Sequence, residues 1–257
     1  MSYITKSHAI EACKKMQVFY SNLFSLYNNF ELDLEENRGR RNILMSQPME
    51  HFLAESLRKS FKDVINDGRT GKADIIIKDD KKEIEVECKL TSPHSSGTIA
   101  FQSDYETLEK KGSLDYVYIV ANETFDEFCV IHFEGLTTDD FRKLSPGARG
   151  KVQMYKYKGM KKATVLYGNV VNNQDIRREK LEQKILDVST SSCEKIMAWT
   201  KKSISLSEGR KYEKKKLVDQ VQRLHNKTNL RINKILEDIN ILNTRKPSYT
   251  IKFKELK

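Results

Sequence analysis

The segment that decides the fold runs from residue 73 to residue 90 and reads ADIIIKDDKKEIEVECKL. Two extended runs, 74–78 and 83–90, flank a polar turn at 79–82, which is the pattern of two strands joined as a hairpin. Side chains alternate between the two faces of a strand. In the second run the apolar face comprises Ile84, Val86, Cys88 and Leu90. The charged face comprises Glu85, Glu87 and Lys89.

The turn also predicts which residues of the two strands face each other. In a symmetric hairpin Lys78 pairs with Glu83, and each facing pair has residue numbers that sum to 161. Asp74 then lies opposite Glu87, with Cβ atoms about 4.5–5.5 Å apart. Two carboxylates at that distance repel each other unless a cation lies between them, and Mg²⁺ prefers such oxygen ligands.

Lys89 lies two residues beyond Glu87 on the same charged face. Its ammonium group could hold or help to deprotonate an attacking water and stabilise charge on a phosphate oxygen. Asp74, Glu87 and Lys89 together are therefore a candidate site for phosphodiester hydrolysis. An exposed hairpin face with ordinary surface charges would show the same residues, so this alternative stays open at the level of sequence.

Apolar periodicity predicts the elements around the hairpin. We expect a loop at 31–45 and an edge strand near 249–253. The other expected helices and strands are, in turn, helices at 4–29, 49–66 (with Pro48 in its first turn), 100–111, 137–144, 177–201 and 207–243, and strands at 114–121, 128–133, 151–157 and 163–167. The chain is thus predicted to have an α/β part over residues 1–170 and a basic helical part over residues 171–257. The helical part would bind DNA, form a dimer interface or do both, and a cap over the sheet is the simpler alternative.

The composition restricts the class of protein. The chain has 257 residues, of which 38% are hydrophobic and 32% charged. This composition suits a globular protein of one or two domains rather than a disordered one. No run approaches the ~18 apolar residues of a membrane span, and the N-terminus lacks the pattern of a signal peptide. The four cysteines form no CxxC pair, so we expect no zinc site, no disulfide framework and a cytoplasmic location.

The charges are distributed unevenly along the chain. Residues 1–140 contain 17 Lys and Arg against 25 Asp and Glu, whereas residues 141–257 contain 29 against 11. Between residues 141 and 174 there are eight basic residues and no acidic one. A segregated basic surface suits a polyanion such as nucleic acid. A solvated basic helix face is the simpler alternative.

Three short motifs resemble those of a nuclease superfamily. Glu50 lies in MEHFLA, Asp74 in ADIII, and Glu87 with Lys89 in VECK. Together they resemble the PD-(D/E)xK signature, and the size and single-site layout are most similar to type II restriction endonucleases. The resemblance covers about a third of the chain, residues 46–121, and Ala73 stands where the family name has proline.

The resemblance implies a fold and a set of roles. The fold would be a restriction-endonuclease-like α/β core, a central mixed sheet flanked by helices, with a C-terminal helical region. Asp74, Glu87 and the backbone carbonyl of Cys88 would bind Mg²⁺, and Lys89 would position the attacking water. Glu50 would approach from a helix and bind either a metal-bound water or a second ion, with Glu55 as the competing candidate.

Residues outside these motifs are candidates for DNA binding. Arg149 and Gln153 have donor patterns suited to guanine and adenine edges, although phosphate contacts are equally compatible. Lys151 and Tyr155 would share a strand face with Gln153. Phosphate contacts are assigned to Lys156, Lys158, Lys161 and Lys162. Gln102 is a weaker candidate near the site. The sequence GRTGK at 68–72 is too short for a phosphate-binding P-loop, so no nucleotide cofactor is expected.

These observations lead to three hypotheses about function. The first is a Mg²⁺-dependent, sequence-specific endonuclease of double-stranded DNA, a homodimer that leaves 5′-phosphate ends. The second is a structure-specific nuclease of the junction-resolvase or repair type, and the third a non-catalytic nucleic-acid-binding protein. Metal-dependent cutting of linear DNA into discrete fragments would distinguish the first hypothesis from the other two.

Overall fold

The computed structural model describes residues 2–67, 69, 72–79, 82–144, 150–206 and 210–256. The chain forms two compact units, Met1–Val171 with Tyr249–Lys257, and Asn172–Ser248. The C-terminal part was expected to comprise residues 171–257, with an edge strand near 249–253, but Tyr249–Lys257 belong to the first unit. The reason is a long-range strand pairing, since β11 (Lys254–Glu255) pairs with β6 (Glu127–Leu136) of the central sheet.

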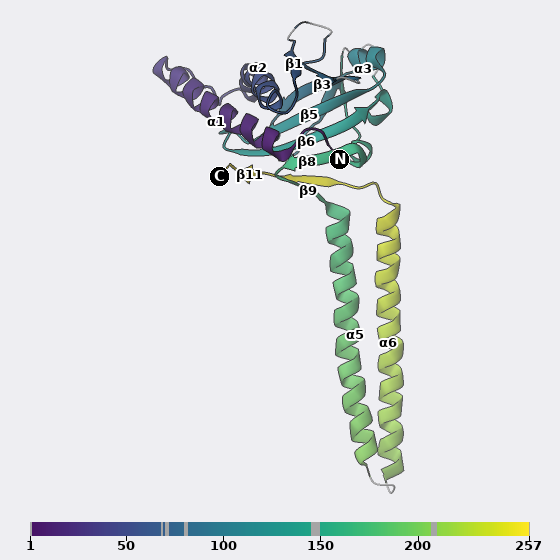
Figure 1. The fold of residues 1–257 in the computed structure, drawn as a ribbon. Helices are drawn as coiled ribbons and strands as arrows, with labels where there is room; N and C mark the ends of the chain where they lie inside the picture. The colour runs from purple at the N-terminus through teal and green to yellow at the C-terminus, as the bar shows by residue number, and fades with distance from the viewer. Residues whose placement is uncertain are drawn as a thin grey trace. The chain divides into compact units, whose positions relative to one another are not determined.

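The first unit is built around a mixed seven-stranded sheet (Figure 1). Its strand order is β1-β2-β3-β5-β6-β11, and β8 also pairs with β6. The pairing of β3 with β5 is parallel, and the others are antiparallel. The strands not yet introduced are β1 (Asp63–Asn66), β2 (Ile75–Asp79), β3 (Lys82–Thr91), β5 (Leu114–Ala121) and β8 (Ala163–Tyr167). The expected α/β class with a mixed central sheet is confirmed.

The hairpin register predicted from the turn is confirmed. Lys78 pairs with Glu83 and Ile75 with Val86. The alternation of faces is also as expected, since Val86 and Cys88 are buried in the apolar core on one side of the sheet. Because the register fixes every side chain along β3, the charged residues lie together on the opposite side.

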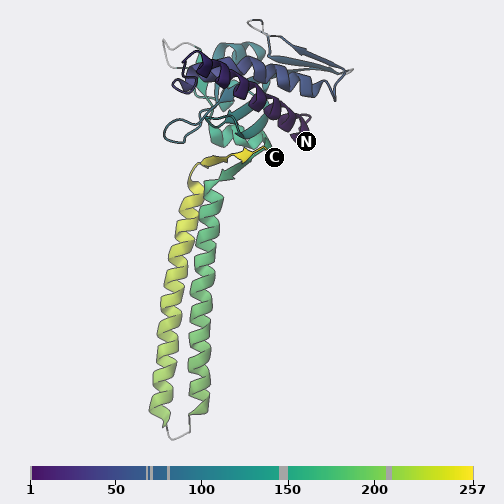
Figure 2. The same ribbon diagram turned by 90° about the vertical axis from the view of Figure 1, so that its left-hand side faces the viewer.

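Helices cover one face of this sheet. The helices α1 (Lys6–Asn29) and α2 (Arg38–Leu57) pack Met16, Met49 and Leu53 onto the apolar side chains of β2, β3 and β5. The opposite face is covered by short elements (Figures 1 and 2). These are β4 (Gln102–Asp104) paired with β7 (Lys151–Gln153), α3 (Tyr105–Lys111), α4 (Lys156–Gly159), and two 3-10 helices at Thr138–Asp140 and Met160–Lys162.

Several expected elements were wrong in type or in extent. The second helix begins at Arg38 rather than 49, because Asn37 caps it by accepting a hydrogen bond from the Arg40 amide, and Pro48 lies inside it. This helix ends at Leu57, and residues 63–66 pair with β2 as strand β1. The helix expected at 100–111 begins with strand β4 instead. The strand expected at 151–157 ends at Gln153 and is followed by α4, and the helix expected at 137–144 is a single 3-10 turn.

The second unit is an antiparallel pair of long helices, α5 (Asn173–Ser205) and α6 (Lys211–Thr244). The two chain segments that flank this pair, β9 (Asn169–Asn172) and β10 (Tyr249–Lys252), form a two-stranded sheet. Both long helices were expected from the sequence, with nearly these bounds. None of the helices in the described ranges is both long and apolar enough for a membrane span.

Candidate active site

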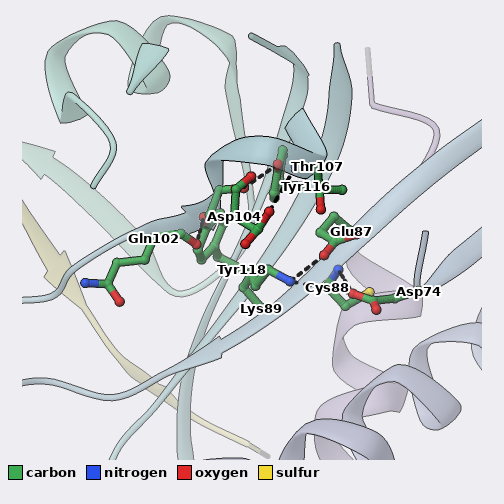
Figure 3. A network of polar contacts seen from close by, with 10 residues as sticks. Asp74, Glu87, Cys88, Lys89, Gln102, Asp104, Thr107, Tyr116 and Tyr118 are labelled. Atoms are coloured by element: carbon green, nitrogen blue, oxygen red, sulfur yellow. Dashed lines mark hydrogen bonds and ion pairs between the residues drawn. The ribbon is translucent and has the colours of Figure 1, made fainter. Parts of the chain in front are cut away.

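Strand β3 presents Glu87 and Lys89 on the same face, and Asp74 lies beside them (Figure 3). The Lys89 ammonium nitrogen lies 2.5 Å from Glu87 Oε1 and 3.9 Å from Asp74 Oδ2. Both carboxylates therefore reach the same cation, as the hairpin register predicted. These three side chains are only partly accessible, with 20%, 13% and 30% of the Asp74, Glu87 and Lys89 side-chain surface exposed.

Asp74 immediately precedes β2, and its carboxylate is held by the backbone of β3. The last β2 pair is Ile75 with Val86, and two residues further along β3 the Cys88 amide donates to Asp74 Oδ2 at 2.7 Å. The N–H and C=O groups of one strand residue point to the same neighbouring strand. The Cys88 carbonyl is therefore directed to the edge of β3 where Asp74 lies, as its expected role as a metal ligand requires.

The parallel strand β5 forms the other wall of the site. Tyr116 is the partner of Glu87 and Tyr118 that of Lys89. The Tyr118 hydroxyl donates to the Gln102 carbonyl at 2.8 Å, and the Tyr116 hydroxyl lies 2.6 Å from Ser103 Oγ. These two tyrosines thus fix β4 above the charged face of β3 (Figure 3).

The structure separates the two helix carboxylates that the sequence left open. Glu55 forms an ion pair with Lys15 of α1 at 2.6 Å. Glu50 is half-buried, and its electrostatic neighbours are Asp74, Lys89 and Glu87. Burial together with the charges of Asp74 and Glu87 outweighs the effect of Lys89 and raises the pKa of Glu50 to about 7. Of the two residues, Glu50 is the one that belongs to the site.

Burial dominates the electrostatics of the other carboxylates. It raises the pKa of Asp74 and of Glu87 despite the opposing charge of Lys89. Burial alone would lower the pKa of Lys89, but the charges of Glu87 and Asp74 outweigh it and raise that pKa. Lys89 is therefore a stable ammonium ion, suited to donating hydrogen bonds and to stabilising negative charge rather than to accepting a proton.

The donor set suits a hard divalent cation. Glu87 Oε1 accepts a hydrogen bond from Lys89, whereas Oε2 is buried without a hydrogen-bond partner among the described residues. A buried carboxylate oxygen without a hydrogen-bond partner raises the free energy of the folded state unless a cation or a water molecule binds to it. No group of three or more His, Cys, Asp or Glu side chains in the described ranges is placed to hold a metal. The fit therefore rests on two carboxylates and the Cys88 carbonyl, without Glu50.

Lys151 is the DNA-binding candidate that the fold brings to the candidate catalytic residues. On the small sheet, Lys151 pairs with Asp104, and Gln153 with Gln102. Lys151, Gln102 and Lys89 line one cavity of about 170 Å³. Lys151 is exposed, so the lining of this cavity includes a solvent-accessible basic side chain.

The other DNA-binding candidates differ in their surroundings. Lys162 is engaged internally, because its ammonium donates to the buried Asp140 at 2.7 Å. Lys158 donates to the Asp139 carbonyl, and Lys156 lies half-buried over the Phe101 ring. Tyr155 does not continue the β7 face with Lys151 and Gln153, because it caps α4. Lys161 is exposed, and Arg149 lies outside the described residues.

Sequence reasoning missed Asp104 and the two tyrosines. Asp104 caps α3 by accepting from the Thr107 amide at 2.9 Å, and its charge helps to raise the pKa of Glu87. Aspartate is a preferred residue at the position before a helix, so the cap itself could have been recognised. Its proximity to Glu87 depends on the pairing of β4 with β7, which joins segments about fifty residues apart.

No protein-family model matches the chain, and searches of curated proteins and of solved structures give no match either. The function of this chain is therefore inferred from its own residues and their geometry.

Proposed function

We propose that this protein is a Mg²⁺-dependent DNA endonuclease whose site consists of Asp74, Glu87 and Lys89. The observation that carries the proposal is the shared contact of both carboxylates with the Lys89 ammonium, beside a buried Glu87 oxygen without a partner among the described residues. An incidental charged strand face would be solvated and would not need to bury this oxygen. The proposal includes a core of restriction-endonuclease type, as the three motifs suggest.

Each residue has a role that follows from its charge state. Asp74, Glu87 and the Cys88 carbonyl would hold the cation, which when bound supplies Lewis acidity toward the phosphate. Lys89, as an ammonium ion, would donate to a non-bridging phosphate oxygen or orient the attacking water. Glu50, with a pKa of about 7, can exchange a proton with solvent near neutral pH.

The finer features of the proposal concern the substrate. The excess of 29 Lys and Arg over 11 Asp and Glu after residue 140 supports a polyanionic partner. The exposed Lys151, which lines the same cavity as Lys89, supports binding of the DNA backbone close to the scissile phosphate. We propose double-stranded DNA cut at a specific sequence by two copies of the chain, one site per strand, with 5′-phosphate products.

The test is cleavage of bacteriophage DNA with Mg²⁺ and with EDTA. We expect discrete fragments only with Mg²⁺. Lys89→Ala and Glu87→Gln should each reduce the cleavage rate by at least about 100-fold, as loss of an electrostatic catalytic group does, while DNA binding in EDTA is retained.

One matched control lies on the same strand face, and its ion-pair partner on α3 provides a second. Glu85 is two residues before Glu87 and forms an ion pair with Lys111, away from the Asp74 carboxylate. Glu85→Gln and Lys111→Ala should therefore cleave at close to the wild-type rate. DNA that stays intact with Mg²⁺ despite measurable binding would refute the proposal. Cutting of branched but not linear DNA would support the structure-specific alternative instead.

A further inference from the structure

The α5–α6 pair has a register that two side-chain contacts define. Ser192 Oγ and Thr228 Oγ1 lie 2.8 Å apart, and Arg178 donates to Asn243 Oδ1 at 2.7 Å. Residues whose numbers sum to about 420, as 192 and 228 do, therefore face each other along helices that lie side by side (Figures 1 and 2). This contact line, the seam, includes Leu181, Ile185 and Ile196 of α5 and Leu224, Ile235 and Ile239 of α6.

Most of the seam is only half-buried, although Leu217 and Leu242 near its two ends are buried. The six apolar residues of the seam named above are all of intermediate exposure. Two helices alone cannot enclose a core, because each presents an apolar stripe wider than one neighbour can cover. A further helical layer on one side of the pair would bury more of this apolar surface.

A second apolar stripe lies on one side of the seam. Leu186, Cys193, Met197 and Ile204 recur at spacings of seven, four and seven residues, which places them on one face of α5, about 120° from the seam. On α6, Val218 and Leu236 lie about 80° from the seam. Because the helices are antiparallel, these two α6 residues lie on the same side of the pair as the α5 stripe.

These six residues define what we call the uncharged face. Leu186 is 59%, Met197 56% and Ile204 78% exposed, and Val218 is 60% exposed. The other side chains there are Ser, Thr, Asn, Gln and His. Within 186–204 and 218–243, the described Lys, Arg, Asp and Glu residues lie outside this face.

The opposite side of the pair is charged and mostly basic. Its surface hollows are lined by Lys180, Lys184 and Arg245 at one end and by Lys216 and Arg223 at the other. Residues 172–248 contain 18 Lys and Arg against 10 Asp and Glu, a net charge of +8. Two copies of this unit would repel each other across any surface that carries this charge.

We infer that the uncharged face is the docking surface for a second copy of this chain, so that two hairpins form a four-helix bundle. Of the two faces, it is the one on which identical basic units can meet without like-charge contact. The charge-free parts of the two helices are level with each other over about 17 residues, 186–202 with 218–234, about 25 Å by 20 Å. This is roughly 500 Å² per copy and 1,000 Å² in total, about the minimum for a specific interface. A nucleic acid would instead select the basic side.

The inference rests on the proposed function only for the expectation of two copies, and its test needs no DNA. Light scattering or sedimentation of the full chain at low and high salt measures its mass in solution, which is compared with 29.9 kDa for one copy. We expect a dimer whose dissociation constant rises at least about ten-fold in Met197→Glu, because a charge would be buried against an apolar partner. Ile204→Glu, at the most exposed position of the stripe, should act in the same way if Met197→Glu fails to fold.

The matched control is Leu230→Glu. Leu230 is 71% exposed on the charged side of α6, so the same type of substitution there should leave the dissociation constant unchanged. A wild-type chain that is monomeric at micromolar concentrations would overturn the inference, as would equal weakening by Leu230→Glu and Met197→Glu. Monomeric wild type with DNA binding lost only in Met197→Glu would show that nucleic acid occupies this face. If wild-type protein is a dimer that binds DNA but does not cleave it with Mg²⁺, the proposed function is refuted and the inferred interface is not.

Discussion

At the scale of single residues, burial at the candidate site disfavours the ionised forms of its carboxyl groups. The carboxyl groups of Asp74 and Glu87 are desolvated, and Lys89 compensates only part of this cost. Such an arrangement is disfavoured as a stabilising device, because a buried ion pair repays its desolvation only with excellent geometry. The proposed cation would offset this cost and would also satisfy the Glu87 oxygen that has no hydrogen-bond partner among the described residues.

A second buried group makes the stability of the fold depend on pH. His132 is fully buried beside Asp115 and Glu134, with Nδ1 2.8 Å from Ser2 Oγ and the Tyr3 ring against it. Burial lowers the pKa of His132 below 6.5 despite the two acids, so the unfolded chain binds the proton more readily. The stability that neutral His132 contributes is full above about pH 6.5 and is lost as the pH falls toward its lower folded pKa.

We therefore expect His132→Gln to reduce the dependence of stability on pH. Urea unfolding at pH 7.5 and at pH 5.5 should show a smaller loss of unfolding free energy on acidification in this variant than in wild type. The comparison of slopes isolates His132 from His8, whose pKa is also lowered by burial and which is present in both proteins. Equal losses in the two proteins would contradict this account.

At the scale of elements, local pairings were predictable and distant ones were not. The β2–β3 register follows from a short turn, so Asp74 and Glu87 could be placed together from the sequence alone. The parallel pairing of β3 with β5 crosses a long connection, and the sequence carries no local signal for it. The start of α2 was missed because Pro48 indicates a first helical turn, whereas Asn37, eleven residues before Pro48, supplies the cap.

The junction of β8 and β9 depends on one glycine. Gly168 has φ of +76°, and a Cβ atom there would lie 2.9 Å from the backbone oxygens of Lys252 and Phe128. Gly168→Ala should lower the free energy of unfolding by roughly 2–4 kcal/mol, because neither backbone carbonyl can move away cheaply. Gly97 also has a positive φ, +72°, but open space around it, so Gly97→Ala should cost only about 1 kcal/mol. Urea unfolding of both variants measures the difference, and equal losses would show that the close approach is unimportant.

At the scale of the whole molecule, the two proposals together predict how a supercoiled plasmid is cut. One copy carries one candidate site, so a dimer can cut both strands during one encounter, whereas a monomer cuts one strand and dissociates. Met197→Glu should therefore convert plasmid mainly to nicked circles, and wild type and Leu230→Glu mainly to linear DNA. Gel analysis over the first turnover separates the two products. Linear DNA formed directly by a monomeric Met197→Glu protein would mean that each copy cuts both strands by itself, and the uncharged face would then have no part in double-strand cleavage.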